Sequence, residues 1–202
     1  MRRAAPVTGQ QSPRDRRDGA ARRRLLAAAL GLSLAPWLGA ARAQSAGVEL
    51  TSLEVQRNDD GLFLDYGLSF ELPRGAEEAL GKSVPLYFVA DAELLRSRWY
   101  WRDKRVARAT RQWRIVYQPL TSNYRVTFAG ISQTYTTRAE ALAAIRRGVQ
   151  WKIADAGQLE GGGHYLEFSF RLDTSLLPRP MQIGIGNPTD WTLVVEKTLQ
   201  VD

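Results

Sequence analysis

The 202-residue sequence contains no cysteine and a single histidine, His164. Without cysteine the chain can form no disulfide, thiolate nucleophile, cysteine-ligated zinc site or lipid attachment at a cysteine. One histidine excludes a histidine-rich metal site, and a Ser-His-Asp triad would have to use His164 itself. We therefore expect a domain with no metal, no other cofactor and no catalytic site.

A long apolar run is missing as well. The longest candidate, Leu25 to Leu38, has 14 residues and contains Gly31 and Pro36, whereas a bilayer span needs about 20 mostly apolar residues. This run follows Arg22-Arg23-Arg24 and precedes Ala41-Arg42-Ala43. A basic start, a short apolar stretch and an A-x-A site, in that order, are typical of a cleaved export signal.

The sequence therefore predicts that residues 1–43 are an export signal, removed on export, and that residues 44–47 are a tether. The periplasm is the expected location, and the leader is the only expected membrane contact. Both the general secretory route and the twin-arginine route fit the arginines before the apolar run. An uncleaved leader that holds the protein at the inner membrane is the alternative.

The mature chain has no net charge. The whole sequence has 28 Lys and Arg against 21 Asp and Glu, but residues 1–43 hold nine arginines and two aspartates, which leaves 19 residues of each sign. The high isoelectric point of the whole chain thus comes from the leader and gives no reason to expect a nucleic-acid partner.

Apolar residues alternate with polar ones through most of residues 48–202, as they do in half-buried strands. The clearest run covers the even positions from Leu62 to Leu72, and Asn58-Asp59-Asp60-Gly61 before it is a turn sequence. These residues predict a hairpin with the preceding strand, in which the alternation slips near Ser52. His164 to Leu172 predicts a second long strand with one apolar face.

Two further features refine the expected fold. The apolar parity changes at Leu94-Leu95, which predicts a bulge followed by a strand with Trp99 and Trp101 on one side. Short helices are expected at residues 77–80 and from Ala141 to Arg147, the second opened by the capping box Thr137-Arg138-Ala139-Glu140 and stopped by Gly148. The sequence therefore predicts a mainly β domain over residues 48–202, an antiparallel β-sandwich, immunoglobulin-like in architecture.

Several motifs occur in an order that resembles a known family. They are Val84-Pro85-Leu86-Tyr87-Phe88, Arg98-Trp99-Tyr100-Trp101, Tyr124-Arg125-Val126, Glu140-Ala141-Leu142, Leu172 to Pro178 and Asp190-Trp191. The chain resembles the exported proteobacterial family catalogued as domain of unknown function 4390. The resemblance implies a Gram-negative periplasmic setting, no established activity and no catalytic residues. Family members often lie in genomes beside the nitrogen-regulation sensor kinase, which suggests a link to envelope signalling.

One segment is strongly basic. Residues 96–114 contain eight basic residues and a single acid, Asp103, interleaved with aromatic residues. One interpretation is a set of core tryptophans with solvated arginines that pair with acids such as Asp91 and Glu93. The other is a binding surface for an anionic component of the envelope. The candidate binding residues are Arg98, Trp99, Tyr100, Trp101, Arg102, Arg105 and Arg108.

Two functions are consistent with these observations. The first is a non-catalytic periplasmic binding or accessory module whose partner is an envelope protein or an anionic polymer or lipid. The second is an envelope hydrolase built around His164, which requires carboxylates or hydroxyls to converge on that side chain. A partly buried, hydrogen-bonded structural histidine is the simpler interpretation of His164, because it shares its face with Leu166 and Phe168.

Overall fold

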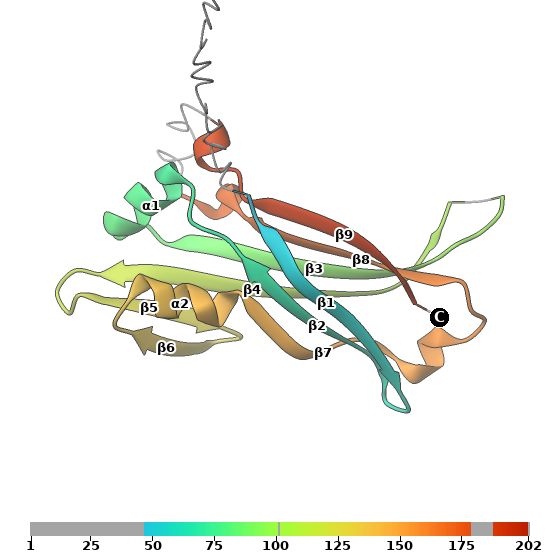
Figure 1. The fold of residues 1–202 in the computed structure, drawn as a ribbon. Coiled ribbons are helices and arrows are strands. Elements are labelled where there is room, and N and C mark those ends of the chain that lie inside the picture. The colour runs from blue at the N-terminus through green and yellow to red at the C-terminus, as the bar shows by residue number, and fades with distance from the viewer. Residues whose placement is uncertain (1–46, 101, 179–187, 202) are drawn as a thin grey trace, which may run out of the picture. The chain divides into compact units, whose positions relative to one another are not determined.

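The computed structural model describes residues 47–100, 102–178 and 188–201 (Figure 1). The chain divides into two compact units, 1–41 and 42–202, and all of the described residues belong to the second. The predicted export signal and residues 44–46 of the tether lie outside the described residues. So do Met181, Ile183 and Ile185, whose alternation in the sequence also predicts a strand. Within the described ranges, no helix is both long enough and apolar enough to cross a bilayer.

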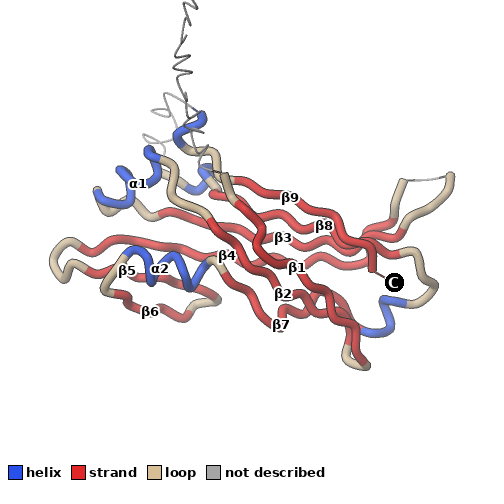
Figure 2. Tube along the Cα trace, viewed as in Figure 1, coloured by secondary structure: helices blue, strands red, loops and turns tan. Residues whose placement is uncertain are grey.

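The described part of the chain is mainly β, as predicted, and its strands form two antiparallel sheets (Figure 2). The smaller sheet has the order β1-β2-β7 and the larger one the order β6-β5-β4-β3-β8-β9. The strands are β1 (Glu49–Asn58), β2 (Gly61–Ser69), β3 (Leu86–Arg96), β4 (Lys104–Gln118), β5 (Asn123–Phe128), β6 (Ile131–Tyr135), β7 (Arg147–Asp155), β8 (His164–Leu172) and β9 (Val194–Val201).

The predicted hairpin over the start of the domain is confirmed. β1 pairs with β2 from Glu49 opposite Ser69 to Asn58 opposite Gly61, and the register shifts between Leu50 and Ser52, where the alternation slips. The side chain of Asn58 accepts hydrogen bonds from the backbone N–H groups of Asp60 and Gly61 at 2.9 and 3.1 Å. Gly61 has a φ of 136°, which a residue with a Cβ rarely adopts.

The predicted irregularity at Leu94-Leu95 is confirmed too. Leu94 lies opposite Ala107 of β4, but Leu95 lies opposite Arg105, so Val106 is the extra residue of a bulge. The pairing between β3 and β4 therefore changes register just before β3 ends at Arg96.

Two α-helices accompany the sheets, α1 (Arg74–Gly81) and α2 (Arg138–Ile145), with short 3₁₀ helices at Ala156–Leu159, Thr174–Leu176 and Pro188–Asp190. α2 lies beside β5 and β6 (Figure 1). The capping box is confirmed, because Thr137 accepts from the N–H of Glu140 and the Glu140 carboxylate accepts from the N–H of Thr137.

The predicted end of α2 is wrong. The helix stops at Ile145, and Gly148 lies within β7 opposite Tyr66 of β2. A Cβ added at Gly148 would lie 2.2 Å from the ring of Tyr66. This glycine is therefore required by close strand packing and does not terminate the helix.

One core is shared by both sheets. The even-numbered residues of β2 and β8, and those of β3 as far as Leu94, are buried, and their aromatic rings pack across the space between the sheets. The ring centroids of Tyr66 and Phe168 are 5.1 Å apart, and Phe70 lies 5.6 Å from Phe88 and 5.5 Å from Phe170. The predicted apolar faces of β2 and β8 are thus the faces that build this core.

Substituting Gly148 tests how tightly the two strands pack. We expect Gly148→Ala to lower the free energy of unfolding by about 1–3 kcal/mol, because the buried ring of Tyr66 cannot move away without disturbing Phe168. Gly157→Ala is the matched control, since nothing lies within 4 Å of its added Cβ, and it should change stability by less than about 0.5 kcal/mol. Denaturant unfolding of both variants measures the difference. Equal stabilities would show that the strands separate easily at this point.

Candidate functional site

The expected strand through Trp99 and Trp101 is wrong. β3 ends at Arg96, and Trp99 and Tyr100 lie in the turn that leads to β4. The side chain of Trp99 is 92% exposed and that of Tyr100 is 67% exposed. Their rings contact each other edge to face, with centroids 4.4 Å apart. Trp101 lies outside the described residues.

We call residues 97–100, 102 and 103 the β3–β4 tip. It lies at one end of the six-stranded sheet, between the ends of β3 and β4 (Figure 1). Together with Arg96, the residues Ser97, Arg98, Trp99 and Tyr100 line an open hollow of about 670 Å³. Two large aromatic side chains exposed next to each other are unusual on a monomer surface, so the β3–β4 tip is the candidate contact site.

The base of the tip is fixed by hydrogen bonds to the loop before β8 and to β8 itself. The backbone N–H of Ser97 donates to the carbonyl of Gly163 at 3.0 Å, and the guanidinium of Arg96 donates to the carbonyl of Gly161 at 2.9 Å. The carboxylate of Asp103 accepts from the N–H of Arg98 at 3.1 Å and from the hydroxyl of Tyr165.

The two bonds to Asp103 also set its ionisation. The hydrogen bonds from Tyr165 and from the backbone of Arg98 hold the pKa of the Asp103 carboxyl below its usual value, and the bond to Asp103 raises the pKa of Tyr165 to about 12. The only acid of the basic segment is therefore ionised and engaged at the base of the tip.

The basic residues of the segment separate into two groups. Arg105 pairs with Glu93 at 2.8 Å, and Arg108 pairs with Asp91 at 3.0 Å and Glu93 at 3.3 Å. Arg98, Arg102 and Lys104 are exposed and form no ion pair with any residue that the structure describes.

The structure thus divides the predicted binding residues. It brings Arg98, Trp99, Tyr100 and Arg102 together at the tip, with Lys104 beside them at the start of β4. It places Arg105 and Arg108 further along β4, on the outer face of the sheet. The interpretation with internal ion pairs describes that second group.

A hydrogen-bond network centres on Asp91, which the sequence indicated as a partner for arginines of the basic segment, and it extends to Thr110 and Arg171, which the sequence did not indicate. This buried carboxylate accepts hydrogen bonds from Thr110 at 2.5 Å, Arg171 at 2.7 Å and Arg108 at 3.0 Å. Burial acts to raise the pKa of Asp91, but these three bonds outweigh it and leave the pKa below the usual value. The alternation of β3 could have indicated this network. Ala90 and Ala92 face the core, so Asp91 and Glu93 lie together on the opposite face of the sheet.

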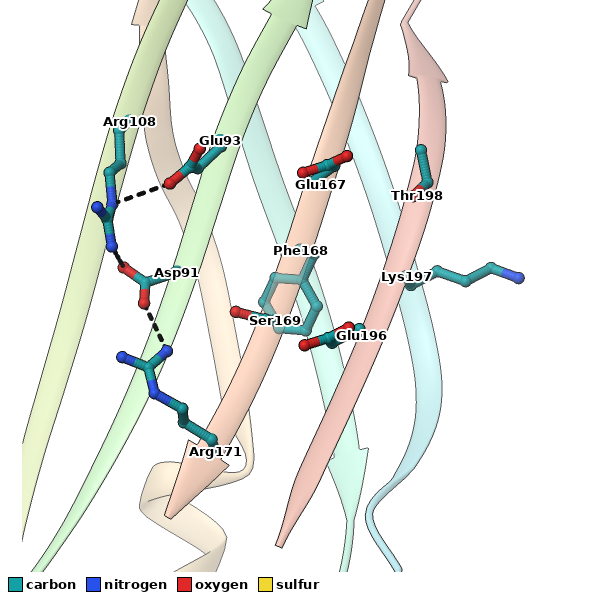
Figure 3. A pocket seen from close by; sticks show the side chains of 10 residues that line it. All are labelled: Asp91, Glu93, Arg108, Glu167, Phe168, Ser169, Arg171, Glu196, Lys197 and Thr198. Atoms are coloured by element: carbon teal, nitrogen blue, oxygen red, sulfur yellow. Dashed lines mark hydrogen bonds and ion pairs between the residues drawn. The ribbon is translucent and has the colours of Figure 1, made fainter. Parts of the chain in front are cut away.

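The Asp91 network forms one side of a polar groove of about 420 Å³ on the large sheet (Figure 3). Glu167 and Ser169 of β8 and Glu196 and Thr198 of β9 line the other side. Both carboxylates on β3 pair with arginines. Because the pKa of Asp91 is lowered, its carboxyl is not a proton donor near neutral pH. No group of three or more potential metal ligands occurs among the described residues.

His164 is more fully buried than predicted, with 2% of its surface exposed. Its Nε2 atom has no hydrogen-bond partner among the described residues, which contradicts the expectation of a hydrogen-bonded ring at that nitrogen. Burial lowers the pKa of His164, and the nearby positive charges of Arg96 and Arg57 lower it further. A catalytic histidine paired with a carboxylate would have the opposite shift.

Comparison with known proteins identifies a family but assigns no activity to it. A family model described as a domain of unknown function (DUF4390) matches residues 45–201. No curated protein and no solved structure matches the chain.

Removing the Asp91 carboxylate should destabilise the domain. We expect Asp91→Ala to lower the free energy of unfolding by about 1–3 kcal/mol, because the hydrogen bonds to two half-exposed arginines are lost. Since the folded pKa is lowered, this stabilisation is present above the unfolded pKa of about 3.9 and disappears as the pH falls through the folded value. Unfolding curves from neutral to acid pH measure it, and Asp91→Asn should flatten the acid limb.

Glu78→Gln is the control for the Asp91 substitutions, because Glu78 forms a solvent-exposed ion pair with Arg74. Its effect should stay below about 0.5 kcal/mol at any pH. If the two substitutions cost the same, the Asp91 network contributes nothing beyond an ordinary surface pair.

The histidine gives a second pH test. Because its folded pKa lies below the unfolded value of about 6.5, the unfolded chain binds the additional proton, and the free energy of unfolding should fall as the pH drops below about 6.5. His164→Leu should lack this component. Denaturant unfolding of both proteins at pH values above and below 6.5 compares the two slopes, and identical slopes would show that His164 is protonated equally in both states.

Proposed function

The chain belongs to the DUF4390 family of unknown function, and we propose that it is a non-catalytic binding or accessory module of the bacterial envelope that makes contact through the β3–β4 tip. The observation that carries the proposal is the exposure of Trp99 beside Tyr100, with unpaired basic residues around them. Tryptophan, tyrosine and arginine are the residues that most often dominate binding energy at contact sites. Elsewhere on the described surface, the exposed apolar pair of Phe128 and Ile131, opposite each other on β5 and β6, has no such pair of exposed aromatic rings.

Export to the periplasm is part of the proposal. It rests on the basic, apolar and A-x-A pattern in residues 22–43, and an uncleaved leader at the inner membrane is the alternative. A folded domain without cysteine is suited to either setting, because it needs no disulfide for its stability.

We also propose that the domain is a β-sandwich, since its two sheets share one core. An immunoglobulin-like architecture stays a prediction. The sheets hold three and six strands among the described residues, whereas constant-type immunoglobulin sheets hold four and three.

The hydrolase alternative depends on His164 and receives little support. The ring faces the core, and the charged groups that influence its pKa are two arginines and no carboxylate. A general base needs access to a substrate and a group that orients it. The binding proposal therefore assigns His164 a structural role.

A photo-crosslinking amino acid placed at Tyr100 tests the function in cells. We expect an adduct with a component of the envelope when the probe replaces Tyr100, and a marked loss of that adduct when Trp99→Ala is added. The same probe at Leu120 is the matched control, because Leu120 is fully exposed in the turn between β4 and β5. Adducts from both positions alike, or from Leu120 only, would contradict a role for the tip.

A further inference from the structure

The β3–β4 tip presents two kinds of chemistry in a fixed order. Trp99 and Tyr100 are its most exposed apolar groups, and Arg98, Arg102 and Lys104 lie next to them in the chain. We propose that the tip docks on the surface of a bilayer that contains anionic phospholipid, with the two rings in the interfacial layer and the basic side chains at the phosphates. This inference rests on the proposed function, because it names the partner of the same surface.

The aromatic pair fits the boundary between headgroups and acyl chains. Tryptophan and tyrosine are enriched in that layer because each ring has an apolar body and one polar atom that needs a wet partner. Trp99 is 92% exposed, so its indole makes almost no contact with the rest of the domain. It can enter the interface without breaking any packing in the fold.

Charge complementarity supports an anionic surface. Arg98, Arg102 and Lys104 have no ion pair among the described residues, while the one acid between them, Asp103, is held by Tyr165 and the Arg98 backbone. The next acids along β3, Glu93 and Asp91, are already neutralised by Arg105 and Arg108. The tip therefore keeps a local positive charge in a domain whose mature sequence is neutral, and anionic lipid attracts such clusters.

The shape of the tip favours a bilayer over the other partners considered. A stable protein interface buries roughly 1,200–2,000 Å² in total, and a turn of a few residues offers only a small part of that area. A soluble anionic polymer supplies phosphate or carboxylate groups but no apolar layer for the two rings. A bilayer supplies both an anionic surface and an apolar layer directly beneath it, and long basic side chains reach such a surface from an apolar position.

Because the chain has no cysteine, one fluorophore can be placed at a chosen position. The full chain with Tyr100→Cys, labelled with an environment-sensitive dye, is mixed with vesicles of phosphatidylglycerol and phosphatidylcholine or with vesicles of phosphatidylcholine alone. We expect a blue shift and brighter emission on the anionic vesicles only. The same dye at Leu120→Cys reports the opposite turn, and any effect of the leader is common to both proteins.

Charge reversal identifies the source of the attraction. Adding Arg98→Glu and Arg102→Glu to the labelled chain should weaken its affinity for the anionic vesicles on the order of 30-fold or more. Each basic residue near an anionic surface raises that affinity about fivefold. Raising the salt concentration should also weaken binding to the anionic vesicles, because salt screens the attraction between charges. The acid unfolding curve of the reversed variant should match the parent, because neither arginine has an ion pair in the described part of the chain.

Two outcomes would overturn the lipid proposal. One is an unchanged dye at position 100 on anionic vesicles, and the other is an equal response at positions 100 and 120. If the crosslink from Tyr100 still captures an envelope protein while the dye stays silent on vesicles, the tip is a protein-binding site and the proposed function stands. If the crosslink and the dye both fail with the protein folded, the proposed function fails as well.

Discussion

The burial of one face of β3 constrains the rest of this domain. Ala90, Ala92 and Leu94 point into the core, so the residues between them must face outward. β3 lies between β4 and β8, and a polar residue in the middle of a sheet needs partners from both neighbours. Asp91 finds them in Thr110 and Arg108 on one side and in Arg171 on the other. The apolar face of one strand thereby determines the charge pattern of three.

This arrangement explains why a run of arginines can exist in a neutral domain without one continuous basic surface. Arg105 and Arg108 of β4 form ion pairs with the acids of β3, Asp91 and Glu93. Arg111 lies over the ring of Trp151 at 5.0 Å, where burial lowers its pKa. Arg98 and Arg102, which lie beyond the end of β3, form no ion pair with any described residue, and neither do Lys104 and Arg114 of β4. The functional proposal depends on where the paired strands stop as much as on which residues are present.

Much of the fold could be predicted because the deciding information was local. The alternation in β2 and β8, the slip at Ser52, the bulge near Leu94 and the capping box before α2 all follow from residues within a few positions of each other. Three features could not be predicted this way. The basic start of β4 has no apolar alternation, and it is a strand because β3 supplies its partners. Gly148 has a role that depends on Tyr66, which is far away in the sequence. The end of β3 before Trp99 depends on the loop at Gly161 and Gly163.

The sequence indicated which segment contains the candidate site, but it did not show which basic residues of that segment lie at the tip and which form ion pairs. Counting charges identified the segment, yet it could not separate arginines with acids across the sheet from those with none. That separation requires the register of β3 with β4, in which Glu93 lies opposite Arg108. Register is a property of two strands together, so the sequence of either one alone cannot supply it.

The anchoring of the tip has a consequence for the kinetics of recognition. Asp103, Ser97 and Arg96 hold the base of the turn against the loop before β8 in the absence of any partner. The conformational entropy of that turn is therefore lost during folding and is not lost again on contact. A preorganised turn can engage in its first productive collision, without a slow rearrangement after encounter. Under the proposed binding role, the loop of Gly161 to Gly163, where all three residues have positive φ, would thus influence the association rate although it presents no side chain.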